Sequence, residues 1–285
     1  MRRLSHTMWV EGYTSTTISY GGKLPITKPN MTQTPPPVKY DKNQIYTLEE
    51  FERLNCWLKT HELVVDGTAV TGFELDPTAK LITVPPVPVR KEVAVMEIGR
   101  QVCQWNILAR QNGVVTSSQG GFSLPPDQEA TLVTGAGLII RAPDVAFTPK
   151  ETYRNLTQEQ LLTFRGEPFH PSFIVEVDDV GTPSKLADLT AKIKNEYFPA
   201  GIELGLLVDP VNRTIYTFKR TKLGNVRRVN RGWSDIPCDP CLPRFVLTVW
   251  LIDDAASQVC YFWFSCSFYK CKAFNSLFYL TTEFI

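Results

Sequence analysis

The side chain most in need of a chemical explanation is Glu176, which stands inside an apolar run. The segment Phe173-Ile-Val-Glu-Val177 is rich in β-branched residues and predicts a buried strand. A carboxylate buried there without a partner would be strongly destabilising. A metal ion, a basic side chain or exposure at the edge of a sheet would each offset that cost.

A second acid, Asp144, stands where Pro143 interrupts one predicted strand and another begins. Two carboxylates on neighbouring strands can share a divalent cation, which polarises a phosphodiester oxygen and lowers the pKa of bound water. Oxygen ligands suit Mg²⁺ or Mn²⁺, and the three histidines of the chain make a histidine-rich zinc site a poor alternative. The residues also fit a plainer interpretation, in which Asp144 caps a turn and Glu176 faces solvent on an edge strand.

A lysine near such a pair can position or deprotonate the attacking water, and two lysines lie on the helix predicted after Glu176. Apolar residues recur along this helix at three- and four-residue spacing and should face the sheet: Leu186, Leu189, Ile193 and Tyr197. Lys192 lies near the border of this apolar stripe, from which a long side chain can reach the edge of the sheet. Lys194 lies about 100° past Ile193, further toward solvent. The geometry favours Lys192 and keeps Lys194 as the alternative.

The elements that must position these residues form a mixture of helices and strands. Thr47-Leu-Glu-Glu50 is a capping box that predicts a helix to about Leu58, and an apolar stripe predicts a second helix from about Lys91 to Arg110. Short helices are expected over 156–162 and 186–198. Strands are expected over 63–66, 79–84, 113–116, 138–141, 145–147, 173–177, 204–208 and 214–218. This order predicts an α/β (α+β) fold with helices packed on a mixed sheet.

The two ends of the chain differ in composition from the middle. Residues 1–44 are rich in Thr, Ser and Pro and are expected to form a disordered arm, whereas 45–254 are expected to form the folded domain. Residues 255–285 form an atypical aromatic-rich tail. Its longest uncharged run covers 15 residues, from Ala255 to Tyr269, which is shorter than the ~20 that a membrane-spanning helix needs. We therefore expect no membrane association, and organellar targeting has only Arg2 and Arg3 in its favour.

Charge and cysteine content exclude some classes of protein. Thirty basic and 29 acidic residues give a formal net charge of +1, which excludes a polycationic tail protein. A local basic strip has no acid between its members and predicts either phosphate contacts to DNA or a solvated hairpin. Its members are Lys219, Arg220, Lys222, Arg227, Arg228 and Arg231.

The seven cysteines are an odd number without a dense framework, which favours reduced thiols in an intracellular protein, cytoplasmic or nuclear. Cys238-Asp-Pro-Cys241 is a lone C-x-x-C pair, and a structural zinc site would want a second pair of ligands.

Several segments together resemble one protein family. Pro143-Asp-Val-Ala-Phe147 and Phe173-Ile-Val-Glu-Val177 are similar to motifs of the Uma-type restriction endonucleases, a family of the PD-(D/E)XK nuclease superfamily. Three further segments resemble the same family: Asn155-Leu-Thr-Gln-Glu-Gln160, Asp188-Leu-Thr-Ala-Lys192 and Tyr197-Phe-Pro-Ala-Gly-Ile-Glu-Leu-Gly205. The resemblance covers roughly residues 45–250.

The resemblance implies a restriction-endonuclease-like core that acts on DNA with Mg²⁺ or Mn²⁺. Asp144 matches the first metal-binding acid of the family and Glu176 the second, while Lys192 matches the lysine of a D-L-x-x-K pattern. Where many members of the superfamily carry a lysine two residues after the second acid, this chain has Asp178. The oligomeric state stays open, a homodimer included.

The chain departs from the family at two places. Counting back from Tyr197, the helix is one residue longer than the usual spacing, which keeps Lys194 as an alternative to Lys192. The acidic loop over 178–184 stands where a shorter loop is common, and its extra acids would bind a second cation or disturb the first. Glu97 resembles an acid on the first core helix of the superfamily, with an ordinary exposed position as the alternative.

Two classes of function remain from the sequence. The first is a metal-dependent endonuclease that hydrolyses DNA phosphodiester bonds. The second is a catalytically inactive protein that keeps the nuclease fold as a nucleic-acid or protein interaction module. The altered loop after Glu176 and the unusual tail favour the second class.

Overall fold

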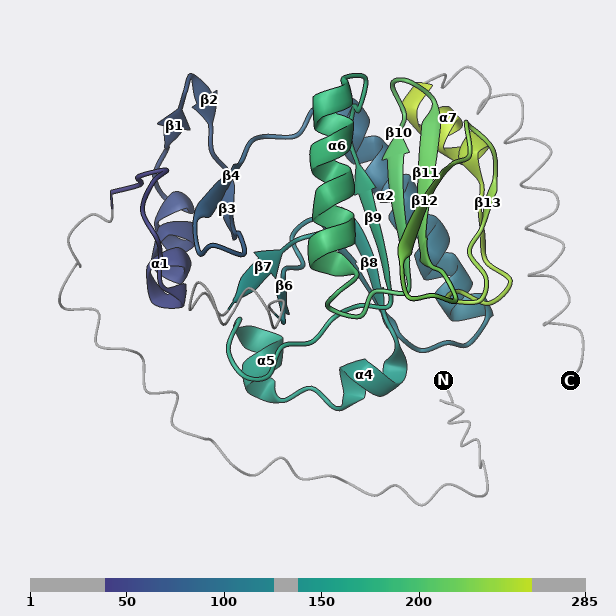
Figure 1. Ribbon diagram of the computed structural model, residues 1–285, viewed down its shortest axis with the longest axis horizontal. Helices are drawn as coiled ribbons and strands as arrows, with labels where there is room; N and C mark the ends of the chain where they lie inside the picture. Colours follow the sequence, from purple (N-terminus) through teal and green to yellow (C-terminus); the bar gives the residue numbers. More distant parts are fainter. Residues whose placement is uncertain (1–38, 126–137, 258–285) are drawn as a thin grey trace, which may run out of the picture. The chain divides into compact units, whose positions relative to one another are not determined.

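The computed structural model describes residues 39–125 and 138–257, all of which belong to one structural unit (Figure 1). Most of the expected N-terminal arm and of the expected tail lies outside the described residues. Helix α7 (Val249–Ser257) includes 255–257, the first residues of that tail. No helix in the described ranges is long and apolar enough to cross a membrane.

A six-stranded mixed sheet forms the centre of this unit. Its strand order is β12-β11-β10-β9-β8-β5. Strands β9 and β10 are parallel, and the other neighbours are antiparallel. The expected α/β fold with a mixed central sheet is therefore confirmed. The strand bounds are β5 (Val114–Ser117), β8 (Val145–Thr148), β9 (Phe173–Val177), β10 (Leu204–Asp209), β11 (Thr214–Arg220) and β12 (Val226–Asn230).

Helices α2 (Val89–Leu108) and α6 (Pro183–Lys192) cover opposite faces of this sheet (Figure 1). Strand β9 is buried along its whole length, and its side chains alternate between the two faces. Phe173 and Val175 pack in the apolar core on the α2 side, whereas Ile174 packs in the core on the α6 side. Glu176 shares the face of Ile174 and therefore points toward α6.

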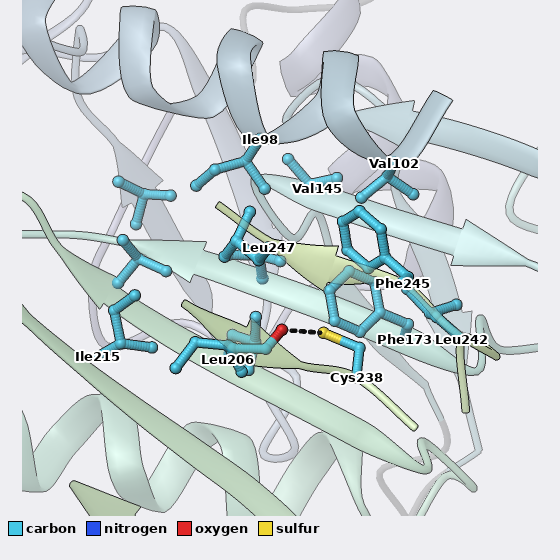
Figure 2. Close-up of a cluster of buried hydrophobic side chains, with 14 of the residues drawn as sticks. Ile98, Val102, Val145, Phe173, Leu206, Ile215, Cys238, Leu242, Phe245 and Leu247 are labelled. Atoms are coloured by element: carbon cyan, nitrogen blue, oxygen red, sulfur yellow. Dashed lines mark hydrogen bonds between the residues drawn. The ribbon is translucent and has the colours of Figure 1, made fainter. Parts of the chain in front are cut away.

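The core on the α2 side is built mainly from buried hydrophobic side chains (Figure 2). Ile98 and Val102 of α2 pack there against Val145, Phe173 and Leu206 of the sheet. Removing such side chains from water is the main force that holds a helix to a sheet.

Cys238 lies in this same core and is fully buried, with its Sγ donating to the carbonyl of Ile236 at 3.5 Å (Figure 2). Burial raises the pKa of the Cys238 thiol, and likewise that of Cys241, to about 12, so neither provides a thiolate. Within the described ranges, no group of three or more His, Cys, Asp or Glu side chains forms a metal cluster.

A smaller four-stranded sheet has the order β4-β3-β7-β6 and packs with helix α1 (Leu48–Leu58), which begins at the predicted Thr47 capping box. Its β7 leads through residues 142–144 into β8 of the central sheet, so Asp144 lies at the junction of the two sheets. Strand β3 was not predicted. The bounds are β3 (Gly72–Leu75), β4 (Leu81–Val84), β6 (Phe122–Leu124) and β7 (Ile139–Arg141).

The remaining elements are short and lie between the larger ones. Strands β1 and β2 pair as a hairpin, and β13 pairs with β14. Leu108, expected in the apolar stripe of α2, is exposed because it lies in the last turn of the helix. The bounds are β1 (Val64–Val65), β2 (Thr68–Ala69), α4 (Lys150–Arg154), α5 (Gln158–Leu162), β13 (Ile236–Pro237) and β14 (Val246–Leu247).

Candidate active site

Asp144 and Glu176 lie next to each other at the end of two paired strands. Strands β8 and β9 are antiparallel with Val145 opposite Val175, so Asp144 continues this register opposite Glu176. Each residue is only 7% exposed. Asp144 Oδ2 accepts a hydrogen bond of 2.7 Å from the backbone N–H of Val177. Glu176 lies on β9, and Asp144 lies in the bend that directly precedes β8, the strand next to it.

The environment of Asp144 opposes its ionisation. Burial, and then the nearby charge of Glu176, raise the pKa of the Asp144 carboxyl to about 6, against the opposing effect of Lys91. Two neighbouring carboxylates in a partly buried site favour any cation that can neutralise them.

Lys192 is the lysine that reaches this pair. Its Nζ lies 3.0 Å from Glu176 Oε1, at 20% side-chain exposure. Although burial disfavours the charged form, the negative charges of Glu176 and Glu74 outweigh it and raise the pKa of the Lys192 ammonium. The alternative, Lys194, lines a surface groove instead. The expected orientation of the two lysines is therefore correct, while the chemical role of Lys192 stays a prediction.

Tyr197 also contacts Glu176, and sequence reasoning had treated it only as a core residue. Its hydroxyl donates to Glu176 Oε1 at 2.7 Å. Burial, and then the charge of Glu176, raise the pKa of the Tyr197 phenol well above its ordinary value, so the phenol keeps its proton and remains a donor.

A π-helical turn, η1 (Ile193–Tyr197), brings Tyr197 and Lys192 to the same carboxylate oxygen. Its N–H groups bond to carbonyls five residues back, as from Phe198 to Ile193 at 3.1 Å. In an α-helix, residues five apart differ by about 140° around the axis, and the wider π-turn reduces this angle. The π-turn accommodates the one residue by which this helix exceeds the spacing expected from the family. Lys192 Nζ lies 5.6 Å from the centre of the Tyr197 ring.

Arg141 anchors a second layer of charges beside the site. It is 1% exposed, and its Nε lies 2.5 Å from Glu196 Oε2 while its Nη1 donates to the carbonyl of Leu75 at 3.0 Å. Arg141 Nη1 also lies 3.5 Å from Glu74 Oε2. Sequence reasoning missed this arginine, although a charged residue that ends an apolar strand was a usable signal.

Glu74, on the unpredicted strand β3, joins this layer to the site. Its Oε2 lies 3.6 Å from Lys192 Nζ, and its Oε1 accepts from the N–H of Ala142 at 3.0 Å. Lys192 is therefore held between Glu74 and Glu176. The alternation of residue types in Gly72-Phe-Glu-Leu75, with apolar residues at every second position, was the sequence signal that could have found Glu74.

Lys91, in the first turns of α2, was expected only as a helix start. Its Nζ lies 3.4 Å from Asp144 Oδ2. Each of the two site acids is thus paired with a lysine from a helix on a different face of the sheet. The whole cluster carries one net negative charge, because four carboxylates (Glu74, Asp144, Glu176 and Glu196) face three cations (Lys91, Arg141 and Lys192).

One oxygen of each site acid stays open. The described partners of Asp144 all contact Oδ2, and those of Glu176 all contact Oε1. Both side chains keep a small exposure to solvent, 10% for Asp144 and 9% for Glu176. Two open carboxylate oxygens beside a net negative charge fit Mg²⁺, which binds through one or two carboxylates and otherwise keeps water or phosphate ligands.

The acids that follow Glu176 are engaged in their own loop. Asp178 Oδ1 lies 2.8 Å from Lys185 Nζ, and Asp179 accepts from the N–H of Gly181 at 2.9 Å. Glu97 is half-buried and pairs with Arg100 at 2.7 Å, so it has no described contact to the site acids.

The basic strip of the sequence becomes the hairpin β11–β12 and the loop after it. Lys219 donates to the carbonyl of Asp239, Arg220 to that of Phe198, and Arg231 to the hydroxyl of Thr217. Three further members of the strip are exposed: Lys222, Arg227 and Arg228. Arg227 and Arg228 also line a surface groove beside α6.

The structure is an α/β protein with a central mixed sheet, two carboxylates where neighbouring strands begin and end, and a helix lysine beside one of them. The model of the Uma2 family, described as "putative restriction endonuclease", matches residues 49–250. This match spans more than half of the chain, so the protein belongs to the Uma2 family.

A solved structure is similar to this chain at low sequence identity. The chain is similar to a crystal structure described as a putative nuclease belonging to DUF820 from Anabaena variabilis, with a TM-score of 0.48 and 12% sequence identity. The similarity covers 74% of this chain and 99% of the other. No curated protein matches the sequence.

Proposed function

We propose that this protein is a Mg²⁺-dependent endonuclease that hydrolyses phosphodiester bonds of DNA, with Mn²⁺ as an alternative metal. The observation that carries the proposal is the pair of open oxygens on Asp144 and Glu176, which lie on neighbouring strands beside Lys192. Membership of a family of restriction endonucleases supports DNA as the substrate.

In this proposal Asp144 Oδ1 and Glu176 Oε2 hold the metal ion. When bound, Mg²⁺ would supply charge neutralisation at the phosphate and a lower pKa for a water ligand. Val177 N–H and Tyr197 hold the other oxygen of each acid, which fixes the direction of the open oxygens. A preorganised site of this kind does not spend free energy on reorientation during the reaction.

Lys192 has the role of orienting the attacking water and balancing the charge that develops on the phosphate. Its Nζ keeps a proton because Glu176 and Glu74 stabilise the ammonium, so it acts as a hydrogen-bond donor and not as a base. Glu74 and Arg141 position Lys192 from behind and need not contact the substrate.

The test is cleavage of a supercoiled plasmid by the full-length protein with and without Mg²⁺. We expect the Lys192→Ala variant to lose at least 100-fold in rate, while a rise in melting temperature with Mn²⁺ persists because both acids remain. The Lys59→Ala variant is the matched control, since Lys59 is exposed at the end of α1. A wild-type protein that neither cleaves DNA nor gains stability with Mn²⁺ would exclude the proposal.

One observation favours a second function, that of a catalytically inactive nucleic-acid or protein interaction module. Lys91 and Lys192 already pair with the two acids, at 3.4 and 3.0 Å, and thereby reduce the charge available to a metal ion. The response to Mn²⁺ separates the two functions. A catalytically inactive module would show no rise in melting temperature even at millimolar Mn²⁺. An intact metal site would be stabilised by Mn²⁺ through mass action.

A further inference from the structure

An open groove runs between α6 and the edge strand β12, and it is lined by cations. Its volume is about 670 Å³. Lys194 and Asn195 line it from the end of the helix, and Arg227 and Arg228 line it from β12. Its lining includes no carboxylate and no aromatic residue. The surface therefore suits an anionic ligand and offers no ring on which a base could stack.

The groove lies on the same face of the central sheet as Glu176. Glu176 is paired with Leu207, and Leu207 with Tyr216, so the three side chains share one face. The guanidinium of Arg228 lies 5.2 Å from the centre of the Tyr216 ring, on this face. At ~4.8 Å per strand, the distance from β9 to β12 is roughly 14 Å, or about four nucleotides of rise along one DNA strand.

Helix α6 and its π-helical turn connect the groove to the candidate active site. Lys192 points to Glu176, whereas Lys194, two residues later, lines the groove. Arg228 Nη1 donates to Thr190 Oγ1 at 2.7 Å and so ties β12 to the same helix. A ligand that lies in the groove would therefore be positioned relative to Lys192 by a single rigid element.

The three cations of the groove have no ion-pair partner among the residues that the structure describes. Arg227 and Arg228 are exposed, and Lys194 is half-buried. Clustered like charges repel one another and are stabilised by a bound polyanion. The rest of the basic strip differs, because Lys219 and Arg220 already donate to backbone carbonyls.

We propose that the α6–β12 groove binds the sugar-phosphate backbone of duplex DNA beside the phosphodiester that is cleaved. The inference rests on the proposed function, since it assumes DNA as the substrate. Lys194, Arg227 and Arg228 contact successive phosphates and carry no sequence information, because phosphate contacts fix register and orientation only. The lysine that the sequence offered as a second catalytic candidate thus has a binding role.

The experiment measures binding of a fluorescein-labelled 30-base-pair duplex by fluorescence anisotropy, in EDTA so that no cleavage occurs. We expect the full-length double variant Lys194→Glu/Arg227→Glu to raise the Kd at least tenfold at low salt. The slope of log K against log salt should fall by about 2, one for each lost phosphate contact. The double variant Lys59→Glu/Lys80→Glu makes the same change in net charge at exposed positions elsewhere and should bind nearly as the wild type.

Other outcomes would overturn the inference. If both double variants lose the same affinity, the effect is one of net charge and the groove has no special role. Wild-type protein that does not bind duplex DNA, or that prefers duplex RNA, also contradicts it. The proposed function is read separately, from cleavage and from stabilisation by Mn²⁺. If the protein binds DNA through the groove but shows neither cleavage nor stabilisation by Mn²⁺, the binding role of the groove is retained and the nuclease function is rejected.

Discussion

The central sheet carries buried acids of two kinds, and they differ in how their oxygens are used. Asp209, at the end of β10, is fully buried and accepts four hydrogen bonds. Its Oδ1 accepts from the N–H groups of Val211 and Asn212, and its Oδ2 from the N–H of Val180 and the amide of Asn212. At the candidate active site, Asp144 and Glu176 each direct all described contacts to one oxygen.

Asp209 uses both oxygens to stabilise the fold, whereas Asp144 and Glu176 are each held by the fold through one oxygen only. Asp209 satisfies donors of a turn that would otherwise be buried without partners, so its own charge is well compensated. Asp144 and Glu176 each have one oxygen without a partner among the described residues, although the two side chains are nearly as buried. The fold therefore tolerates two under-used carboxylates at one place, which is the pattern expected where binding or chemistry requires them.

The largest expected effect is on activity, from the Glu176→Gln variant. The amide keeps the shape of the side chain but removes a negative charge from the proposed metal site. We expect Mg²⁺-dependent cleavage to fall at least 1,000-fold, about 4 kcal/mol in activation free energy. Plasmid cleavage measures it, and the rise in melting temperature with Mn²⁺ should disappear. A variant that keeps both responses would show that Glu176 does not bind the metal.

The corresponding change at the other kind of acid is Asp209→Ala, which should act on the fold. It leaves three backbone N–H groups and one side-chain amide without their acceptor, and we expect a loss of about 3 kcal/mol in the free energy of unfolding. Urea denaturation measures it. At a temperature where this variant is still folded, stabilisation by Mn²⁺ should persist. A loss of the metal response together with the fold would erase the distinction between the two kinds of acid.

A smaller effect depends on pH and concerns Asp144→Asn. The pKa of Asp144 is raised from 3.8 to about 6, mainly by burial, so the folded state binds this proton more tightly than the unfolded state. The ionised carboxylate therefore destabilises the fold. This cost is absent below about pH 4, grows as the pH rises toward 6 and is constant above it.

The Asp144→Asn variant should consequently be more stable than the wild type at pH 7, by about 3 kcal/mol, with the advantage fading toward pH 4. Urea denaturation at pH 4, 5, 6 and 7 in EDTA measures the difference. A difference that is constant over this range would contradict the assigned cause, because a loss of packing alone does not depend on pH.

The smallest expected effect comes from Tyr197→Phe, which removes the hydroxyl that holds Glu176 Oε1. Lys192 remains on the same oxygen, so the expected loss in the free energy of unfolding is only about 1 kcal/mol. Because the direction of the open oxygen is less well fixed, we also expect weaker Mn²⁺ binding, measured by titration calorimetry. Unchanged Mn²⁺ affinity in this variant would make the Tyr197 hydroxyl a packing contact only.

Local sequence patterns were sufficient for the elements that carry the two acids. Strand β9 has the predicted bounds, Phe173 to Val177, because β-branched and aromatic residues make up all of the segment except Glu176. The orientation of Lys192 followed from helical geometry, since the apolar stripe of α6 fixes which side faces the sheet. The catalytic and metal-binding roles of these residues, and the domain limits, stay predictions.

The partners that complete the site could not be predicted, because they come from distant parts of the chain. Glu74 pairs with Lys192 and Lys91 pairs with Asp144, and each pair is distant in the sequence and forms only through the packing of β3 and α2. Tyr197 depends on η1, a deviation from α-helical geometry for which the sequence offered only a count of one surplus residue. A local pattern can mark a residue such as Glu74 or Arg141 as unusual, but the pairing of these residues with the site results from the tertiary fold.

The π-helical turn has a consequence for how this helix can change in length. In a regular α-helix, adding or deleting one residue rotates everything beyond it by about 100°, which would turn a packed face toward water. At η1 the surplus is confined to one turn, so Phe198 and the chain that follows stay docked on the sheet. The turn is therefore a position where the chain can gain or lose one residue. The helix before it can stay oriented toward the site carboxylates, while the residues after it stay packed in the apolar core.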